Sequence, residues 1–179
     1  MNETEQPTIN HSQLVEAAAK WLGNRCSIVI TELSTIGETP DAIGWHGKHS
    51  ILVECKASRS DFLADKSKWF RREDWQGVGI TRYFMVPPGI IALEELPAKW
   101  GLLELTRDSV RIIRESEYFQ EANHRHEIGI LLSTLRRVGQ CAPSGVSIRC
   151  YTIKTQNRAS FGVCADGENN QQQNNEKTM

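Results

Sequence analysis

Asp41, Glu54 and Lys56 are the residues of this sequence whose types and spacing best fit a chemical task. Two carboxylates at cross-strand distance repel each other unless a positive charge lies between them. Mg²⁺ and Mn²⁺ prefer hard oxygen ligands of this kind, and a neighbouring ammonium can orient a water molecule or a phosphate oxygen. Together these groups would suit metal-assisted hydrolysis of a phosphodiester bond. The alternative interpretation is a solvent-facing Glu-Lys pair beside a Pro-Asp turn.

A β-hairpin over residues 39–56 would bring these three side chains together. Residues 51–53 are apolar and partly β-branched, which predicts a buried strand. Pro40 is compatible with the first residues of the partner strand. A turn at Gly47-Lys48 places the two carboxylates directly opposite each other, with the lysine on the same face. A turn at His46-Gly47 would keep the aspartate on that face, diagonal to the glutamate.

These residues resemble the PD-(D/E)XK nuclease superfamily. Pro40-Asp41 followed by Glu54-Cys55-Lys56 is similar to its Asp, Glu and Lys motif. Segments 57–66, 82–87 and 100–104 resemble the branch that contains mitomycin-type DNA-repair nucleases and related phage proteins. The resemblance implies an α/β fold with a restriction-endonuclease-like core, in which helices flank a central mixed sheet.

The resemblance also implies roles for single residues. Asp41, Glu54 and Lys56 would be the catalytic residues, and Asp41, Glu54 and the Cys55 main-chain carbonyl would bind Mg²⁺ or Mn²⁺. Lys56 would act as the base or orient the attacking water. To act as a base, Lys56 would need a lowered pKa. The nearby anions raise the pKa of an ammonium, whereas a bound metal ion lowers it. We therefore favour orientation and charge stabilisation for Lys56.

Basic residues follow the hairpin directly. Residues 56–72 hold six basic and two acidic side chains, a local charge of +4 in a chain of net charge −1. This run is either a solvated face or a patch that contacts DNA phosphates. The candidates for DNA contact are Arg59, Lys66, Lys68, Arg71 and Arg72, and by the resemblance Gln76 and Arg82. The residues expected to share the buried face of this helix are Phe62, Leu63, Trp69 and Phe70.

Two further acidic residues could join the site. Glu16 lies nearly opposite the apolar stripe of a helix predicted to begin at Asn10 and to end at Gly23-Asn24, which favours a solvated role. Glu38 lies in a loop before the hairpin, where a solvated role is again the commoner one.

A later helix is predicted over residues 119–138, and residues 147–154 are predicted to form an edge strand. The side chains expected on the buried face of that helix are Ile128, Leu131, Leu132, Leu135 and Val138.

The composition favours one soluble domain. We expect a flexible segment at 1–9, a single nuclease-like domain at 10–165 and a disordered polar tail at 166–179. A net charge of −1 confines any nucleic-acid site to a local patch. Five cysteines without a Cys-x-x-Cys pair indicate free thiols in a reducing compartment. With no apolar leader and no membrane-length segment, we expect a cytoplasmic protein without membrane contact.

The oligomeric state and the preference for DNA ends, structure or sequence are left open by these patterns. The expected function is that of a Mg²⁺-dependent deoxyribonuclease in DNA repair or phage DNA processing. A catalytically silent DNA-binding module, or an accessory protein on the same fold, is the alternative.

Overall fold

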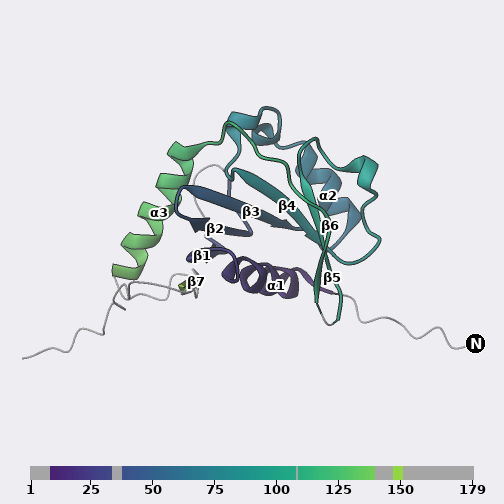
Figure 1. Ribbon diagram of the computed structural model, residues 1–179, viewed down its shortest axis with the longest axis horizontal. Coiled ribbons are helices and arrows are strands. Elements are labelled where there is room, and N and C mark those ends of the chain that lie inside the picture. The colour runs from purple at the N-terminus through teal and green to yellow at the C-terminus, as the bar shows by residue number, and fades with distance from the viewer. Residues whose placement is uncertain (1–8, 34–37, 108, 140–146, 151–179) are drawn as a thin grey trace, which may run out of the picture.

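The sheet is the central element of the protein (Figure 1). The computed structural model describes residues 9–33, 38–107, 109–139 and 147–150. In chain order the elements are α1 (His11–Gly23), β1 (Ile28–Thr31), β2 (Ala42–His46), β3 (His49–Cys55), α2 (Arg59–Lys66), η1 (Trp69–Arg71), η2 (Asp74–Gln76), β4 (Thr81–Val86), η3 (Leu93–Glu95), β5 (Gly101–Leu105), β6 (Val110–Arg114), α3 (His124–Gly139) and β7 (Ser147–Cys150).

The described strands form one seven-stranded mixed sheet in the order β6-β5-β4-β3-β2-β1-β7. β3, β4 and β5 run parallel, and the other neighbouring pairs are antiparallel. The chain therefore has an α/β fold with a mixed sheet flanked by helices, as predicted. None of the described helices is long and apolar enough to cross a membrane.

Each face of the sheet has its own apolar core. One core joins α1 to residues such as Val53 and Met85, and the other joins α2 and α3 to residues such as Leu52 and Phe84. Successive residues of β3 and β4 thus point to opposite faces. Glu54 has the parity of Leu52, so it lies on the face that α2 covers.

The hairpin forms as predicted, with the turn at Gly47-Lys48. His46 pairs with His49, and Ala42 pairs with Val53. Gly47 has φ +59°, a left-handed conformation that glycine adopts without steric cost. The first of the two predicted registers is therefore confirmed.

The first helix also follows its local signals. Asn10 Oδ1 accepts the Gln13 N–H over 3.0 Å, and Gln13 Oε1 accepts the Asn10 N–H over 2.9 Å. This capping box satisfies two N–H groups that would otherwise lack partners. α1 ends at Gly23, as its sequence predicts.

The helix after Lys56 is shorter than predicted. α2 begins after Ser58, whose Oγ accepts the Asp61 N–H, and it ends at Lys66. A turn then leads into η1, so the helical spacing no longer applies. Phe62 and Phe70 are buried, but Leu63 is 48% exposed and Trp69 is 53% exposed. The prediction that all four share a buried face is therefore wrong for Leu63 and Trp69.

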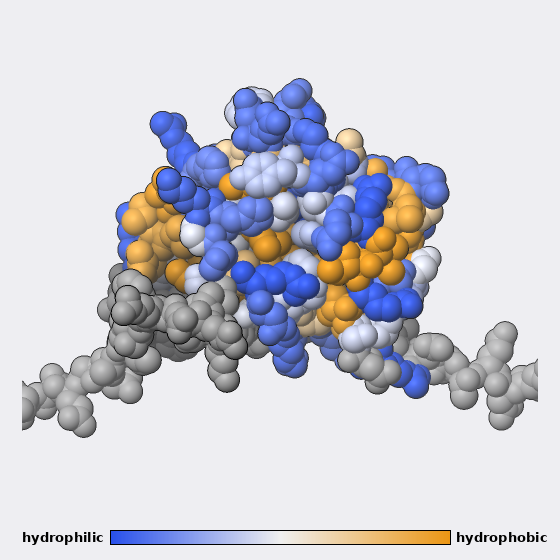
Figure 2. Space-filling model, in the orientation of Figure 1, coloured by the Kyte–Doolittle hydropathy of each residue, from blue (hydrophilic) through white to orange (hydrophobic). Residues whose placement is uncertain are grey.

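The last helix begins later and faces another way than predicted. α3 begins at His124, and the Asn123 carbonyl accepts the Glu127 N–H. The described residues of α3 that are buried are Glu127, Ile130 and Thr134, whereas Ile128, Leu132 and Leu135 are 56%, 47% and 66% exposed. Figure 2 shows the resulting apolar patch over α3. The predicted buried stripe is thus wrong for those three exposed residues, whereas Leu131 is half-buried and the Val138 side chain lies outside the described part of the chain.

A buried carboxylate sets the rotation of α3. Glu127 Oε1 accepts hydrogen bonds from Ser50 Oγ and from the Gly79 N–H, each over 2.8 Å. Glu127 Oε2 accepts the Trp45 indole N–H over 3.3 Å. These three donors belong to the sheet and the loop beside it, so they hold the side of α3 that carries Glu127 against the sheet.

Some predictions fall outside the described residues. They concern residues 1–8 of the N-terminal segment, the end of the 10–165 domain, residues 151–154 of the late strand and the tail at 166–179. β7 confirms the part of the late strand at residues 147–150.

Replacing Glu127 with Ala should lower the free energy of unfolding by roughly 3 kcal/mol or more. Three buried donors would lose their acceptor, and each costs about 1–3 kcal/mol when unsatisfied. Urea unfolding would measure the change. Glu121→Ala, at an exposed side chain before α3, is the matched control. A Glu127→Ala protein as stable as the control would contradict the role assigned to this carboxylate.

Candidate functional site

The three residues singled out from the sequence meet at one end of β3. The β2–β3 register places Asp41 opposite Glu54, and the Cys55 N–H donates to Asp41 Oδ2 over 2.8 Å. The Lys56 N–H donates to the Met85 carbonyl of β4 over 3.0 Å, so the ladder continues through the lysine. The hairpin and the parallel neighbouring strand thus fix the three side chains on one face.

Lys56 lies between carboxylates. Its Nζ is 2.7 Å from Glu54 Oε2 and 3.4 Å from Asp41 Oδ2. The same Nζ is 3.4 Å from Asp65 Oδ1 in α2. The side chains of Lys56, Glu54 and Asp65 are 8%, 2% and 1% exposed, whereas that of Asp41 is 21% exposed. Asp41 is therefore the carboxylate of this group through which a ligand would reach the cluster.

Arg71 is the second buried cation of the cluster. Its Nε is 2.8 Å from Asp65 Oδ2, and its Nη2 is 3.1 Å from Glu54 Oε1. Its Nη1 pairs with Glu38 Oε1, and the other Glu38 oxygen accepts the Val78 N–H over 2.8 Å. Glu38 thus joins the site through Arg71. The guanidinium, at 4% side-chain exposure, is directed inward and not toward a surface where phosphates could bind.

The cluster holds more negative than positive charge. Its four carboxylates belong to Glu38, Asp41, Glu54 and Asp65, and its two buried cations are Lys56 and Arg71. Four negative charges against two positive charges leave an excess of two. Lys68, at the rim with its Nζ 2.7 Å from Asp65 Oδ1, offsets one of these. A further cation would therefore be favoured at the cluster.

The pKa shifts follow from this charge balance. Burial and the nearby Glu54 raise the pKa of Asp41, and Lys56 compensates only in part. Burial opposes the charge on Lys56, but attraction to Glu54, Asp41 and Asp65 prevails, so the pKa of Lys56 lies above its usual value. Burial would likewise raise the pKa of Asp65, yet Arg71 and Lys56 lower it to about 2. Lys56 is thus held as an ammonium at neutral pH.

The cluster contains carboxylate oxygens, the ligand type that hard divalent cations prefer. Within the described residues, no three His, Cys, Asp or Glu side chains form a group that could hold a metal ion. Asp41 and Glu54 are the side-chain ligands that the family resemblance implies, with the Cys55 carbonyl as the implied main-chain donor. Mg²⁺ is commonly bound by one or two carboxylates and keeps several waters. A structural zinc ion needs about four nitrogen or sulfur ligands.

Two members of the cluster were not predicted from the sequence. Asp65 supplies a buried carboxylate, and its place in the 57–66 segment is the signal that could have identified it. His11, at the start of α1, has its Nε2 3.5 Å from Asp41 Oδ1 and a side chain that is 51% exposed. No local pattern marks His11, because α1 and the hairpin meet only in the folded chain.

The predicted DNA-contact residues lie in different environments. Arg59 pairs with Glu95 at the surface, and Lys66 Nζ donates to the Glu95 carbonyl over 2.9 Å. Lys68 lies at the rim of the cluster, and Arg72 is exposed. Gln76 is half-buried in η2. Contact of these residues with DNA stays a prediction.

Arg82 has a structural role, which corrects the expectation of a surface contact. The residue is 2% exposed, and burial lowers its pKa to about 10. Its guanidinium donates to the main-chain carbonyls of Gly79 and Gly77, over 2.9 and 3.0 Å, and lies 4.0 Å from the centre of the Phe119 ring. The side chain is therefore engaged in holding the loop before β4.

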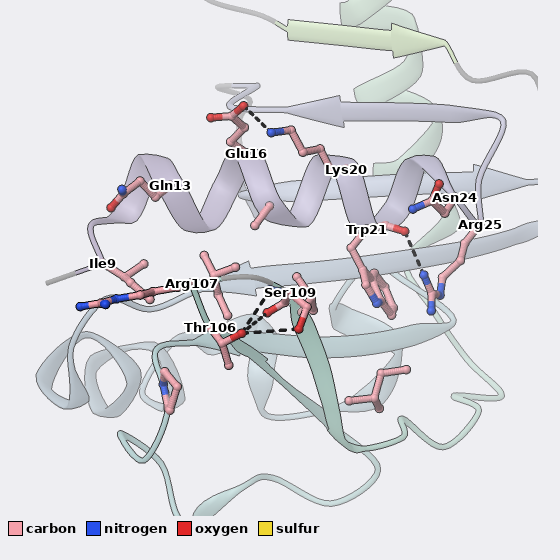
Figure 3. A pocket seen from close by; sticks show the side chains of 15 residues that line it. Ile9, Gln13, Glu16, Lys20, Trp21, Asn24, Arg25, Thr106, Arg107 and Ser109 are labelled. Carbon is pink, nitrogen blue, oxygen red and sulfur yellow. Dashed lines mark hydrogen bonds and ion pairs between the residues drawn. The ribbon is translucent and has the colours of Figure 1, made fainter. Parts of the chain in front are cut away.

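Glu16 lies apart from the cluster. It lines an open groove of about 1070 Å³ between α1 and the β5–β6 hairpin (Figure 3), where it pairs with Lys20 over 2.9 Å. Arg25 also lines this groove, with its guanidinium 4.0 Å from the centre of the Trp21 ring. The carboxylate cluster does not line the groove, so Glu16 does not join the site, as the sequence favoured.

Comparisons with known proteins support the fold and no more. No protein-family model matches the chain, and no curated protein matches it. Among solved structures the chain is similar to a protein of unknown function from Silicibacter pomeroyi, with a TM-score of 0.56 and 23% sequence identity. The match covers 75% of this chain and 90% of that chain.

The lowered pKa of Asp65 predicts a pH-dependent stability. An unfolded Asp titrates near pH 4, so folding gains stability above that pH and loses it as pH falls toward the folded value of about 2. We expect wild type to be more stable than Asp65→Asn at neutral pH. The difference should shrink by about 2 kcal/mol between about pH 4 and pH 2. Urea unfolding over this range would measure it, with exposed Asp61→Asn as control. A constant difference would contradict the assignment.

Proposed function

We propose that this protein is a Mg²⁺-dependent nuclease that hydrolyses DNA phosphodiester bonds on a restriction-endonuclease-like core. The observation that carries the proposal is the pair Asp41 and Glu54, held face to face by a hairpin beside Lys56, in a cluster with excess negative charge. Such a pair is costly unless a cation offsets it. A role of these carboxylates in binding a catalytic metal ion would explain why the fold tolerates this cost in free energy.

Each residue has a distinct task in this proposal. Asp41 and Glu54 would hold the divalent cation, with the Cys55 main-chain carbonyl as a further ligand. When bound, the cation would supply Lewis-acid polarisation of the scissile phosphate. Lys56 stays protonated beside the two anions, so it orients the attacking water and stabilises charge, which agrees with its raised pKa. Arg71 holds Glu54 in place through its 3.1 Å ion pair.

The surroundings of the cluster support a nucleic-acid substrate. Lys66 at the end of α2 and Arg72 after η1 are exposed, and Lys68 lies at the rim of the cluster. Cationic side chains at this place would attract phosphates toward Asp41, the most exposed carboxylate. A local patch of this kind is compatible with a chain of net charge −1.

A DNA-binding module without catalysis is the second candidate, and one observation favours it. The Lys56 ammonium already lies within 3.4 Å of both carboxylates, where it offsets part of their repulsion without any metal. In that case the cluster would serve stability, and the exposed basic residues would bind DNA. A cleavage assay separates the two candidates.

Metal binding is the first test. Calorimetry with Mn²⁺ should detect one divalent site in wild type, and Asp41→Asn should weaken it by more than about tenfold, because it removes an anionic ligand. Glu16→Ala is the matched control, since it removes a carboxylate outside the cluster. Equal heats for wild type and Asp41→Asn would refute the site.

Lys56→Ala should separate cleavage from binding. The single-turnover rate with Mg²⁺ should fall by roughly 10²- to 10³-fold, the usual cost of removing one positioned group that stabilises charge in the transition state. DNA affinity in Ca²⁺ should change little, since one phosphate contact is a small share of the electrostatic attraction. Lys48→Ala, in the exposed hairpin turn, is the control.

Two results would speak against this mechanism. Wild-type cleavage rates in Lys56→Ala would remove Lys56 from it. A wild-type protein that binds DNA with every metal yet never cuts it would favour the binding module.

A further inference from the structure

Two tryptophans beside the cluster are unusually exposed. Trp69 in η1 is 53% exposed and Trp75 in η2 is 55% exposed, whereas Trp21, Trp45 and Trp100 are between 3% and 8% exposed. η1 and η2 are neighbours in the fold, in contact with each other. Exposed indole rings lose the stabilisation of burial. Two exposed indole rings on adjoining turns are therefore a candidate binding surface.

η1 is tied to the carboxylate cluster on both sides of Trp69. Lys68 precedes it, with its Nζ 2.7 Å from Asp65 Oδ1. Arg71 follows within the same turn, with its Nη2 3.1 Å from Glu54 Oε1. Trp69 consequently projects from a segment whose neighbouring side chains reach the buried carboxylates.

The Trp69 ring is braced before any ligand arrives. It meets the buried Phe70 ring edge-on, with ring centres 5.4 Å apart and an interplanar angle of 79°. Arg71 in turn lies 4.8 Å from the centre of the Phe70 ring. A ring held in this way loses little conformational freedom on binding, which favours affinity.

η2 is anchored as well. The Asp74 carbonyl accepts a hydrogen bond from Arg82 Nη2 over 2.6 Å, and the Asp74 carboxylate pairs with Lys99 over 2.6 Å. The turn that presents Trp75 is therefore fixed from the core and from the surface.

Exposed cationic side chains flank Trp69 in the sequence. Lys66, Lys68 and Arg72 are exposed, whereas two acidic residues, Glu73 and Asp74, precede Trp75, and Asp74 is paired with Lys99. Aromatic rings interleaved with cations are the arrangement by which proteins bind single-stranded nucleic acid, because bases stack on the rings while cations attract phosphates. An acidic or purely apolar protein partner would use only one of these two features.

We propose that Trp69 and Trp75 form a stacking platform for unpaired bases, so that the preferred ligand is single-stranded DNA or a duplex with a single-stranded end. Bases inside a duplex already stack on their neighbours, and only an unpaired base offers a free face to an indole ring. The role of the platform, which is to lead a single strand to Asp41 and Glu54, rests on the proposed nuclease function. Its binding of single-stranded DNA does not depend on cleavage.

The test is a fluorescence titration in Ca²⁺, with an oligo-dT strand and a duplex of equal length. The single strand should quench tryptophan emission and bind more tightly than the duplex. Trp69→Ala and Trp75→Ala should each weaken binding of the strand by roughly 5- to 150-fold, since one stacked base contributes about 1–3 kcal/mol. Trp69→Phe should retain most of the affinity, because a phenyl ring still stacks.

Leu135→Ala, which removes an exposed apolar side chain from α3, is the control and should bind as wild type does. Equal affinity for strand and duplex, or unchanged binding by both Trp→Ala variants, would overturn the platform and leave the rings to a protein partner. Tight binding of the strand through the tryptophans, without any cleavage in Mg²⁺, would sustain the platform and refute the nuclease.

Discussion

The gathering of four carboxylates, three of them buried, around Lys56 and Arg71 is the constraint on which the rest of the site depends. Each ionised carboxylate taken out of water costs several kcal/mol unless a partner offsets it. The hairpin brings Asp41, Glu54 and Lys56 together, but one ammonium cannot compensate them all. The chain therefore returns after α2 to insert the Arg71 guanidinium on the other side of Glu54.

This return explains local structure that helix patterns do not. α2 ends at Lys66, the chain turns, and Arg71 on the following turn reaches Glu54. The turn carries Trp69 away from the face that a continuous helix would bury. An electrostatic requirement thus overrides an apolar pattern, and it leaves an indole ring exposed beside the cluster.

The features predictable from the sequence are those that local interactions determine. The Gly47 turn fixes the hairpin register, and the capping box at Asn10 fixes the start of α1. The features that the sequence predicted wrongly depend on residues that lie far apart along the chain. Arg71 binds Glu38, 33 residues away, and Trp45 binds Glu127, 82 residues away, so no window of sequence shows either pairing. The pattern of α3 could not reveal that a buried carboxylate, not its leucines, sets its rotation.

The large sequence separation between Glu127 and its partners also suggests an order of folding steps. Its partner Ser50 lies 77 residues earlier, whereas the β2–β3 hairpin closes over a turn of two residues. Closing a long loop costs more entropy than closing a short one, so local pairings form sooner. The chain also leaves the ribosome N-terminus first. We therefore expect the nascent chain to gather its carboxylate cluster before α3 is synthesised, with the packing of α3 and the pairing of β7 with β1 as the slow, later steps.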